Sequence, residues 1–250
     1  MKNVQLSKRL FAAASLVPGG SRVADVGTDH GFVPIYLINE NIAEHVVAMD
    51  VNEGPLERAK EHVHEYGLDE KIELRLSDGL KELSEGEADT MVCAGMGGLL
   101  MMRILKEGDP VGKGIKTMIL QPQSDLVNFR IYLSENNLVI DDEREIFEEG
   151  KYYTMMRVRS DFSGDLTPEE MAVNEIVGHC CCEKERAIHI CHRFGPVLIL
   201  RKDSVLKNYL EHELSVYNKI LKKISENEHT DRIRDIINKK NDITTVLSMY

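Results

Sequence analysis

Carboxylates stand near the ends of three successive apolar runs, and such side chains can bind hydroxyl, amino and cationic groups. Residues 25–31 read Asp-Val-Gly-Thr-Asp-His-Gly, Asp50 ends the second run, and Asp78 follows the third. A glycine just beyond a parallel strand lets the backbone turn tightly and approach a ligand at the carboxyl edge of the sheet. The spacing therefore predicts one ligand pocket lined by Asp25, Asp50 and Asp78.

The turn after Asp25 does not match the dinucleotide fingerprint, which places glycines at its first, third and sixth positions. Counted from Gly27, the third and sixth positions are Asp29 and Phe32. A carboxylate at Asp29 would also repel a pyrophosphate. The turn therefore favours a cationic ligand without phosphate, and S-adenosylmethionine is the expected cofactor.

Asp50 and Asp78 have separate expected roles in such a pocket. A carboxylate at the end of the second strand can accept both ribose hydroxyls of a nucleoside. Alternatively, Asp50 or Asn52 caps the helix that opens near Pro55. Asp78 is placed to accept the adenine amino group, although Asp-Gly pairs also occur in simple turns.

The fourth apolar run ends in residues 93–98, Cys-Ala-Gly-Met-Gly-Gly. Three glycines around one methionine let a substrate group approach backbone atoms closely. We therefore expect this turn to lie where an acceptor meets the methyl group of the cofactor. A flexible loop leading into a helix would have the same composition.

Alternating strands and helices must position these residues. Short strands are predicted at residues 22–26, 45–50, 71–76, 89–94 and 117–121. Apolar residues at helical spacing predict a helix at 55–66, and this alternation predicts a parallel sheet covered on both faces. Segments 139–147 and 152–159 follow with no helix between them, so they predict a closing antiparallel hairpin.

The pattern becomes mostly helical after residue 160. Two apolar stripes with spacings of three and four residues suit a coiled-coil seam. The first stripe is Leu206, Leu210, Leu214, Tyr217, Leu221 and Ile224, and the second is Ile233, Ile236, Ile237, Ile243 and Leu247. A polar turn at 227–230 between them predicts an antiparallel helical hairpin. We expect one α/β domain at residues 1–160 and a helical, coiled-coil-like domain at residues 161–250.

The composition excludes a disordered chain, because 42% of the 250 residues are hydrophobic. No apolar run reaches the roughly 18 residues of a membrane-spanning helix, and the first residues lack a signal-peptide pattern.

The five cysteines are odd in number and clustered, which favours a reducing cytoplasm over a disulfide framework. Cysteines 180–182 on a helix would point about 100° apart and could not converge on one ion. We expect a buried or half-exposed helix there, and no metal.

Six segments together resemble the bacterial tRNA (adenine-N1)-methyltransferases that act on adenine 22 in the D-arm region. The segments are residues 23–31, 50–56, 77–80, 94–98, 120–122 and 150–153. Their types and order make the resemblance specific over about residues 6 to 155. The sequence departs from the family pattern at Gln123, where asparagine is expected after Gln-Pro.

The resemblance implies a class I methyltransferase fold, with a mostly parallel seven-stranded sheet joined to a helical domain for tRNA binding. It implies transfer of the methyl group of S-adenosylmethionine to N1 of adenine 22. We also expect a cytoplasmic enzyme and favour a monomer over a dimer, although the helical seam could pair within one chain or between two. The expected cofactor-binding residues are Asp25, Gly27, Thr28, Asp29, His30, Asp50, Val51, Asp78, Gly79 and Gly95. The expected catalytic residues are Asp29, His30, Met96 and Tyr153, and the expected substrate-binding residues are Arg9, Gly97 and Gln121.

The acidity of the chain limits where RNA could bind, because phosphate contacts need Lys and Arg. Residues 1–160 carry 18 Lys and Arg against 27 Asp and Glu, a net of −9, whereas residues 201–250 carry 10 against 8. Contacts with tRNA are therefore expected to be local and salt-sensitive, through Lys8, Arg9, Arg22 and the C-terminal lysines.

Two other classes of protein fit the same residues. One is a methyltransferase with a different acceptor, because the fold alone does not fix the substrate. The other is a non-catalytic module that binds nucleosides or RNA, which the intact set of acidic strand ends disfavours. For the methyltransferase, we expect Asp29 or the carbonyl groups around Gly95 and Met96 to stabilise charge at adenine N6, with His30 and Tyr153 shaping the base pocket. Alternatively, Asp29 only orders the cofactor loop.

Overall fold

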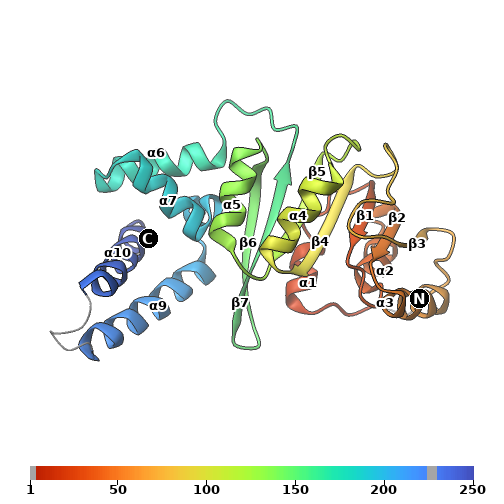
Figure 1. The fold of residues 1–250 in the computed structure, drawn as a ribbon, viewed down its shortest axis with the longest axis horizontal. Helices are drawn as coiled ribbons and strands as arrows, with labels where there is room; N and C mark the ends of the chain where they lie inside the picture. The colour runs from red at the N-terminus through yellow and green to blue at the C-terminus, as the bar shows by residue number, and fades with distance from the viewer. Residues whose placement is uncertain (1–3, 224–229) are drawn as a thin grey trace. The chain divides into compact units, whose positions relative to one another are not determined.

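Seven strands form one sheet in the order β3-β2-β1-β4-β5-β7-β6 in the computed structural model, which describes residues 4–223 and 230–250 (Figure 1). The strands are β1 Ser21–Val26, β2 Ala43–Asp50, β3 Ile72–Leu76, β4 Thr90–Met96, β5 Thr117–Pro122, β6 Val139–Glu148 and β7 Lys151–Arg159. Strands β1 to β5 are parallel, whereas β7 is antiparallel to both β5 and β6. The structure thus confirms the predicted parallel sheet with a closing hairpin.

Helices cover both faces of this sheet. They are α1 Lys8–Ala14, α2 Phe32–Asn39, α3 Glu53–Glu65, α4 Gly98–Gly108 and α5 Leu126–Glu135. The side chains of β6 alternate between the two faces, as in any strand. Arg144 and Ile146 line a pocket with α1, while Glu143 forms an ion pair with Arg130 of α5. Helix α1 therefore lies on one face and α5 on the other.

The strand order explains why the predicted site residues meet. Strand β1 lies between β2 and β4, so the chain reverses its direction of progress across the sheet beside β1. In open α/β sheets, such a switch point leaves a crevice at the carboxyl ends of the strands. The turns that follow β1, β2, β3 and β4 all lie at this edge.

The contacts divide the chain after Gly164, and we call residues 165–250 the helical unit and the preceding part the α/β unit. The helices of the helical unit are α6 Pro168–Cys180, α7 Lys184–Phe194, α8 Pro196–Leu200, α9 Ser204–Lys223 and α10 Thr230–Leu247. Thr167 and Glu170 cap the start of α6 reciprocally. The two predicted apolar stripes lie on α9 and α10, which contact each other.

Only part of each stripe is buried. Leu206 and Leu210 of α9 and Ile243 of α10 enter a core shared with α6, α7 and α8, whereas Ile237 is exposed. Residue 224 of the first stripe and residues 227–229 of the predicted turn lie outside the described residues. A coiled-coil seam along the pair therefore stays a prediction.

The predicted helix through the three adjacent cysteines is wrong beyond Cys180. That residue ends α6, and Cys181 is exposed with a left-handed φ of 49°. Cys182 lies in the connection that leads to α7. The left-handed residue stops the helical hydrogen-bond pattern, which the helix propensities of the surrounding residues did not reveal.

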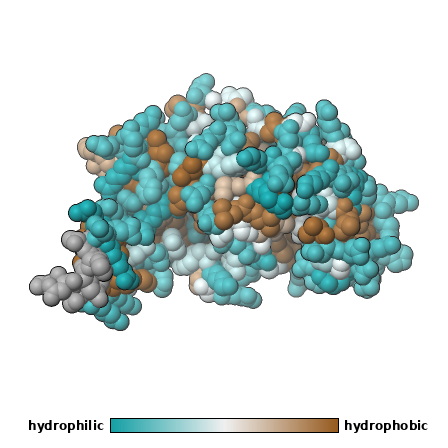
Figure 2. Space-filling model, in the orientation of Figure 1, coloured by the Kyte–Doolittle hydropathy of each residue, from teal (hydrophilic) through white to brown (hydrophobic). Residues whose placement is uncertain are grey.

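The surface of the molecule seen in Figure 2 is largely hydrophilic, with apolar areas separated from one another. Among the helices of the described residues, none is both long and apolar enough to cross a membrane.

Candidate active site

Asp25 is the buried carboxyl group of the site. It lies near the end of β1, opposite Ala48 of β2 and Val92 of β4, and only 5% of its surface is exposed. Burial raises the pKa of Asp25 to about 6, and the charge of Asp50 adds to that rise. The nearby Thr28 hydroxyl acts in the opposite direction and lowers this pKa. A neutral ligand would leave this carboxyl group half-protonated near pH 6, whereas a cationic ligand would favour its ionised form.

The turn after β1 is fixed by backbone hydrogen bonds to β2. The N–H groups of Gly27 and Thr28 both donate to the carbonyl oxygen of Met49, at 2.8 and 3.0 Å. Gly27 has a φ of 82°, and a Cβ atom there would lie 2.2 Å from Cε of Met96. The left-handed φ favours glycine at this position, and a side chain there would also have to displace the end of the Met96 side chain, which lies directly against the turn.

Thr28 is buried, yet its Oγ1 has no partner of ordinary hydrogen-bond geometry within the described residues. It lies close enough to Asp25 to affect the pKa of that carboxyl group. Buried hydroxyl groups without a hydrogen bond are uncommon, because losing water without a replacement is unfavourable. This hydroxyl is thus available to a ligand.

Asp29 and His30 lie at the exposed side of the same turn. The Asp29 carboxylate accepts a hydrogen bond of 3.1 Å from Arg58 of α3 and is 65% exposed. The His30 ring stacks on Phe32, which in turn stacks on His62, with centroid distances of 5.7 and 4.8 Å. These contacts hold the turn against α3.

Asp50 does not cap α3. Its Oδ1 accepts the backbone N–H of Asn52 at 2.8 Å, and Asn52 itself makes no side-chain capping bond. The neighbouring Val51 is 60% exposed. The Asp50 carboxylate is half-buried at the carboxyl end of β2, the position expected for a ribose acceptor.

Asp78 is paired with two cations. It accepts hydrogen bonds from Arg103 of α4 at 3.0 Å and from Lys81 at 2.6 Å. These partners lower the pKa of Asp78 to about 2, with Arg103 as the larger cause. An adenine amino group would therefore share a carboxylate that already has partners. Gly79 follows with a φ of 66°, and its Cα packs closely under Ile104.

The glycines after β4 permit a close crossing of two turns. A Cβ atom on Gly98 would lie 2.4 Å from the backbone oxygen of Ser124, and one on Gly97 would lie 3.2 Å from the Ser124 hydroxyl. The carbonyl oxygen of Met96 accepts the backbone N–H of Gln123 at 2.8 Å. Gly95 has a φ of 86° and faces the side chains of Arg9 and Gln123.

Arg9, Gln121 and Tyr153 form a second cluster at this edge. Arg9 of α1 donates to Oε1 of Gln121 at 3.3 Å, and its guanidinium lies over the Tyr153 ring at 5.6 Å. Gln121 is 1% exposed, and its Nε2 has no hydrogen-bond partner within the described residues. The cluster thus offers an aromatic face, a cation and a buried donor beside Gly95.

Most of the predicted site residues therefore lie along one edge of the sheet. Arg22 does not, because it lies at the amino end of β1, where it donates to the carbonyl oxygen of Gly86 at 2.8 Å. Cys93 is close to the site but buried, and burial raises the pKa of its thiol to about 12. Nowhere in the described part of the chain do three His, Cys, Asp or Glu side chains gather to hold a metal ion.

Several residues of the site escaped the sequence analysis. Arg58 and His62 support the first turn from α3, and Arg103 and Lys81 hold Asp78. Their signal was weak, because charged and polar residues on a helix surface are ordinary. Only the contacts with distant residues distinguish them.

Comparison with known proteins places this site in context. Residues 6–156 match the model of a family described as a methyltransferase domain. The chain is 30% identical over 240 residues to the Bacillus subtilis (strain 168) protein named tRNA (adenine(22)-N(1))-methyltransferase, covering 94% of each protein. It also matches the crystal structure of the B. subtilis M1A22 tRNA methyltransferase TrmK, with a TM-score of 0.75 at 28% identity over 98% of this chain and 100% of that one. The structure of M. capricolum TrmK in complex with S-adenosyl-homocysteine matches with a TM-score of 0.77 at 28% identity over 98% of each chain.

Proposed function

Because this chain belongs to the tRNA (adenine(22)-N(1))-methyltransferase family, we propose that it transfers a methyl group from S-adenosylmethionine to N1 of adenine 22 in tRNA. The observation that carries the proposal is the line of carboxylates at the carboxyl ends of β1, β2 and β3, beside the glycine turn of β4. Membership over 94% of the chain extends the proposal to the acceptor as well as to the cofactor.

The residues present fit S-adenosylmethionine. The buried Thr28 hydroxyl has no partner of ordinary hydrogen-bond geometry within the described residues, although it lies close enough to Asp25 to lower the pKa of that carboxyl group. The left-handed φ of Gly27 favours glycine beside Met96. Asp25 is a buried carboxyl group that a cation would ionise. We assign the cofactor to these residues together with Asp29, His30, Asp50, Val51, Asp78, Gly79 and Gly95.

Within this assignment, Asp50 accepts the ribose hydroxyls, because its Oδ2 is not used by Asn52. Asp78 accepts the adenine amino group while Arg103 and Lys81 hold the carboxylate in place. The two cations also keep Asp78 ionised, so it remains an acceptor at acidic pH.

The target adenine is assigned to the edge lined by Arg9, Gly97, Gln121 and Tyr153. The Tyr153 ring supplies a surface against which a base can pack, and Gln121 Nε2 supplies a buried donor. Arg9 links these two side chains, so it positions the base pocket from α1.

When bound, S-adenosylmethionine supplies a methyl group on a sulfonium, which leaves as a neutral thioether. The adenine N1 lone pair is free, so the chain does not have to remove a proton before transfer. Charge that develops on the base spreads to N6, so an acceptor near N6 stabilises the transition state more than the ground state. We assign this acceptor to the carbonyl groups around Gly95 and Met96, because the exposed Asp29 carboxylate is paired with Arg58. The Met96 oxygen accepts the backbone N–H of Gln123 and would use its second lone pair.

The helical unit is assigned to tRNA binding, and residues 1–160 to catalysis. The last fifty residues carry 10 Lys and Arg against 8 Asp and Glu, in contrast to the acidic α/β unit. We also propose that the protein is a cytoplasmic monomer, and the free cysteines of the described residues are compatible with a reducing compartment.

The test is methyl transfer to defined tRNA. Purified protein is incubated with methyl-labelled S-adenosylmethionine and an unmodified tRNA transcript that carries adenine at position 22, and the nucleosides are then separated. We expect label in N1-methyladenosine, and none with a transcript in which guanine replaces that adenine. Absence of label from the first transcript, or equal label in both, would overturn the assigned acceptor.

A further inference from the structure

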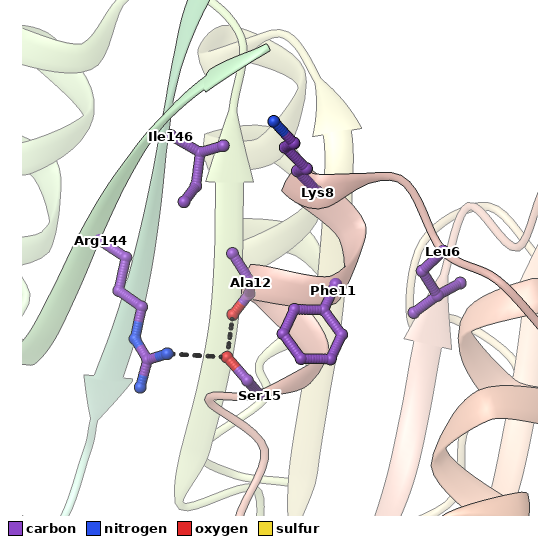
Figure 3. A pocket seen from close by; sticks show the side chains of 7 residues that line it. All are labelled: Leu6, Lys8, Phe11, Ala12, Ser15, Arg144 and Ile146. Atoms are coloured by element: carbon purple, nitrogen blue, oxygen red, sulfur yellow. Dashed lines mark hydrogen bonds between the residues drawn. The ribbon is translucent and has the colours of Figure 1, made fainter. Parts of the chain in front are cut away.

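A pocket of about 360 Å³ lies between α1 and β6 (Figure 3), and of its lining residues only Lys8 was expected from the sequence to contact tRNA. Its lining is mainly apolar at the centre and cationic at the rim. The side chains that the argument uses are Leu6, Phe11, Ala12, Ile146, Lys8 and Arg144. Figure 3 shows Arg144 and Ile146 from the strand on one side, and Lys8 and Phe11 from the helix on the other.

The two cations of this pocket are not neutralised. Within the described residues, neither Lys8 nor Arg144 forms an ion pair with a carboxylate, although the α/β part of the chain is strongly acidic. Arg144 donates one hydrogen bond of 2.9 Å to Ser15 Oγ, which itself donates to the carbonyl oxygen of Ala12. These bonds fix the guanidinium at the rim and leave its other N–H groups for a ligand.

The nearest acidic residue already has another role. The Glu148 carboxylate accepts the backbone N–H groups of Lys8 at 2.7 Å and of Arg9 at 3.4 Å. It thereby caps the N-terminus of α1, where the helix dipole favours a negative charge. Glu148 is therefore engaged with the backbone and leaves the Lys8 ammonium group available.

Phe11 presents an aromatic surface to this pocket. Its side chain is 51% exposed, and its contact with Tyr36 is edge-on, at 6.0 Å and 77°. An edge-on contact occupies less of the ring than a stacked one. Exposed aromatic rings beside cations are characteristic of surfaces that bind unpaired nucleotides.

Residues of this pocket neighbour those of the proposed base pocket. Lys8 and Arg9 are adjacent on α1, and Arg9 contacts Gln121 and Tyr153. Ile146 of the pocket pairs with Tyr153 across the β6–β7 hairpin. A polynucleotide that places one base at Tyr153 would therefore reach this pocket with a neighbouring nucleotide.

We propose that the pocket between α1 and β6 binds one nucleotide of the tRNA next to the target adenine. Its base packs against Phe11 and Ile146, and a phosphate contacts Lys8 and Arg144. This inference rests on the proposed function, because it names how the same substrate is held. A peptide strand pairing with the edge strand β6 is the competing occupant, but such pairing uses backbone groups and does not require two unpaired cations.

The experiment measures steady-state methylation of the tRNA transcript by the full chain and three variants. We expect Phe11→Ala to raise the KM for tRNA about tenfold with little change in kcat, because stacking on one base is removed. Phe11→Tyr keeps the ring and is expected to retain a KM near that of the unmodified protein. The double variant Lys8→Gln/Arg144→Gln is expected to make the KM for tRNA less dependent on salt. The slope of log KM against log salt concentration should fall by about 0.7 for each phosphate that the variant no longer binds.

Lys116→Gln is the control for loss of a positive charge away from the pocket, because Lys116 is exposed at the opposite, amino edge of the sheet; it removes one charge, whereas the double variant removes two. It should leave the KM for tRNA and its salt dependence unchanged. The affinity for S-adenosylmethionine, measured by equilibrium dialysis, should be the same in all variants.

Two outcomes would overturn the inference. In the first, the unmodified protein methylates tRNA, but the KM for tRNA is unchanged in Phe11→Ala and in the double variant. This outcome would leave the proposed function intact. The second is an equal loss of affinity for S-adenosylmethionine in those variants, which would indicate general damage to α1. Failure of the proposed function is distinct, because the unmodified protein would then transfer no label.

Discussion

The substitution Asp25→Asn tests whether burial sets the ionisation of the carboxyl group beneath the cofactor site. The pKa of Asp25 rises from its ordinary value of 3.8 to about 6, mainly because burial disfavours the charged form. A carboxyl group whose folded-state pKa is raised stabilises the fold in its protonated form. That stabilisation is complete below about pH 4 and is lost as the pH rises through about 6.

The size of the effect follows from the shift in pKa. A difference of about 2 units at about 1.4 kcal/mol per unit gives about 3 kcal/mol of lost folding free energy above pH 7. At about pH 5 most of the folded protein still holds the proton, and the loss is about half as large. Asparagine does not titrate. The difference in the free energy of unfolding between Asp25→Asn and the unmodified protein should therefore shift in favour of the variant by between about 1 and 2 kcal/mol from about pH 5 to above pH 7.

The assay is urea unfolding of the ligand-free protein and the variant at about pH 5 and about pH 7.5, followed by circular dichroism. Comparing the two proteins at each pH cancels the titration of every other group. Asp165→Asn serves as the control. Because Asp165 is exposed, its substitution should change the free energy of unfolding by the same small amount at both pH values.

A stability difference between Asp25→Asn and the unmodified protein that is the same at both pH values would refute the reasoning. It would mean that water or structural relaxation offsets the burial of this carboxyl group. A difference that grows as the pH falls would have the wrong sign and would refute it more strongly.

Two further predictions concern packing. Glu143→Ala should destabilise the protein by about 3–5 kcal/mol in urea unfolding, because it breaks the buried ion pair between Glu143 and Arg130. The double variant Arg130→Met/Glu143→Leu should recover much of that loss, and an equal loss in both would contradict this reasoning. Gly98→Ala should lower both stability, by roughly 1–3 kcal/mol, and methyl transfer, because its Cβ would meet the backbone oxygen of Ser124. Gly178→Ala in α6 meets no atom within 4 Å and should instead raise stability by about 0.4–1 kcal/mol, so that opposite signs in thermal unfolding identify the clash.

The positions of the strands of the α/β unit and of the helix at 55–66 were predictable from the sequence, because apolar periodicity and turn residues act over short distances. Asp25, Asp50 and Asp78 were found for the same reason, since each lies at or just beyond the end of a strand. The match of residues 6–156 to a methyltransferase model is consistent with that reasoning. The end of α6 at Cys180 was not predictable, because a single left-handed residue stops the helix there.

The sequence by itself determined which carboxylates and glycines lie at the strand ends; that one ligand pocket gathers them stays a prediction. Only the tertiary structure decided how these groups are electrostatically tuned. It pairs Asp78 with Arg103, buries Asp25 between two strands, and brings Arg9 to Gln121 and Tyr153 from the other end of the domain. Such contacts join residues far apart in the chain. The strand order sets which segments meet, and local periodicity in the sequence carries no information about that order.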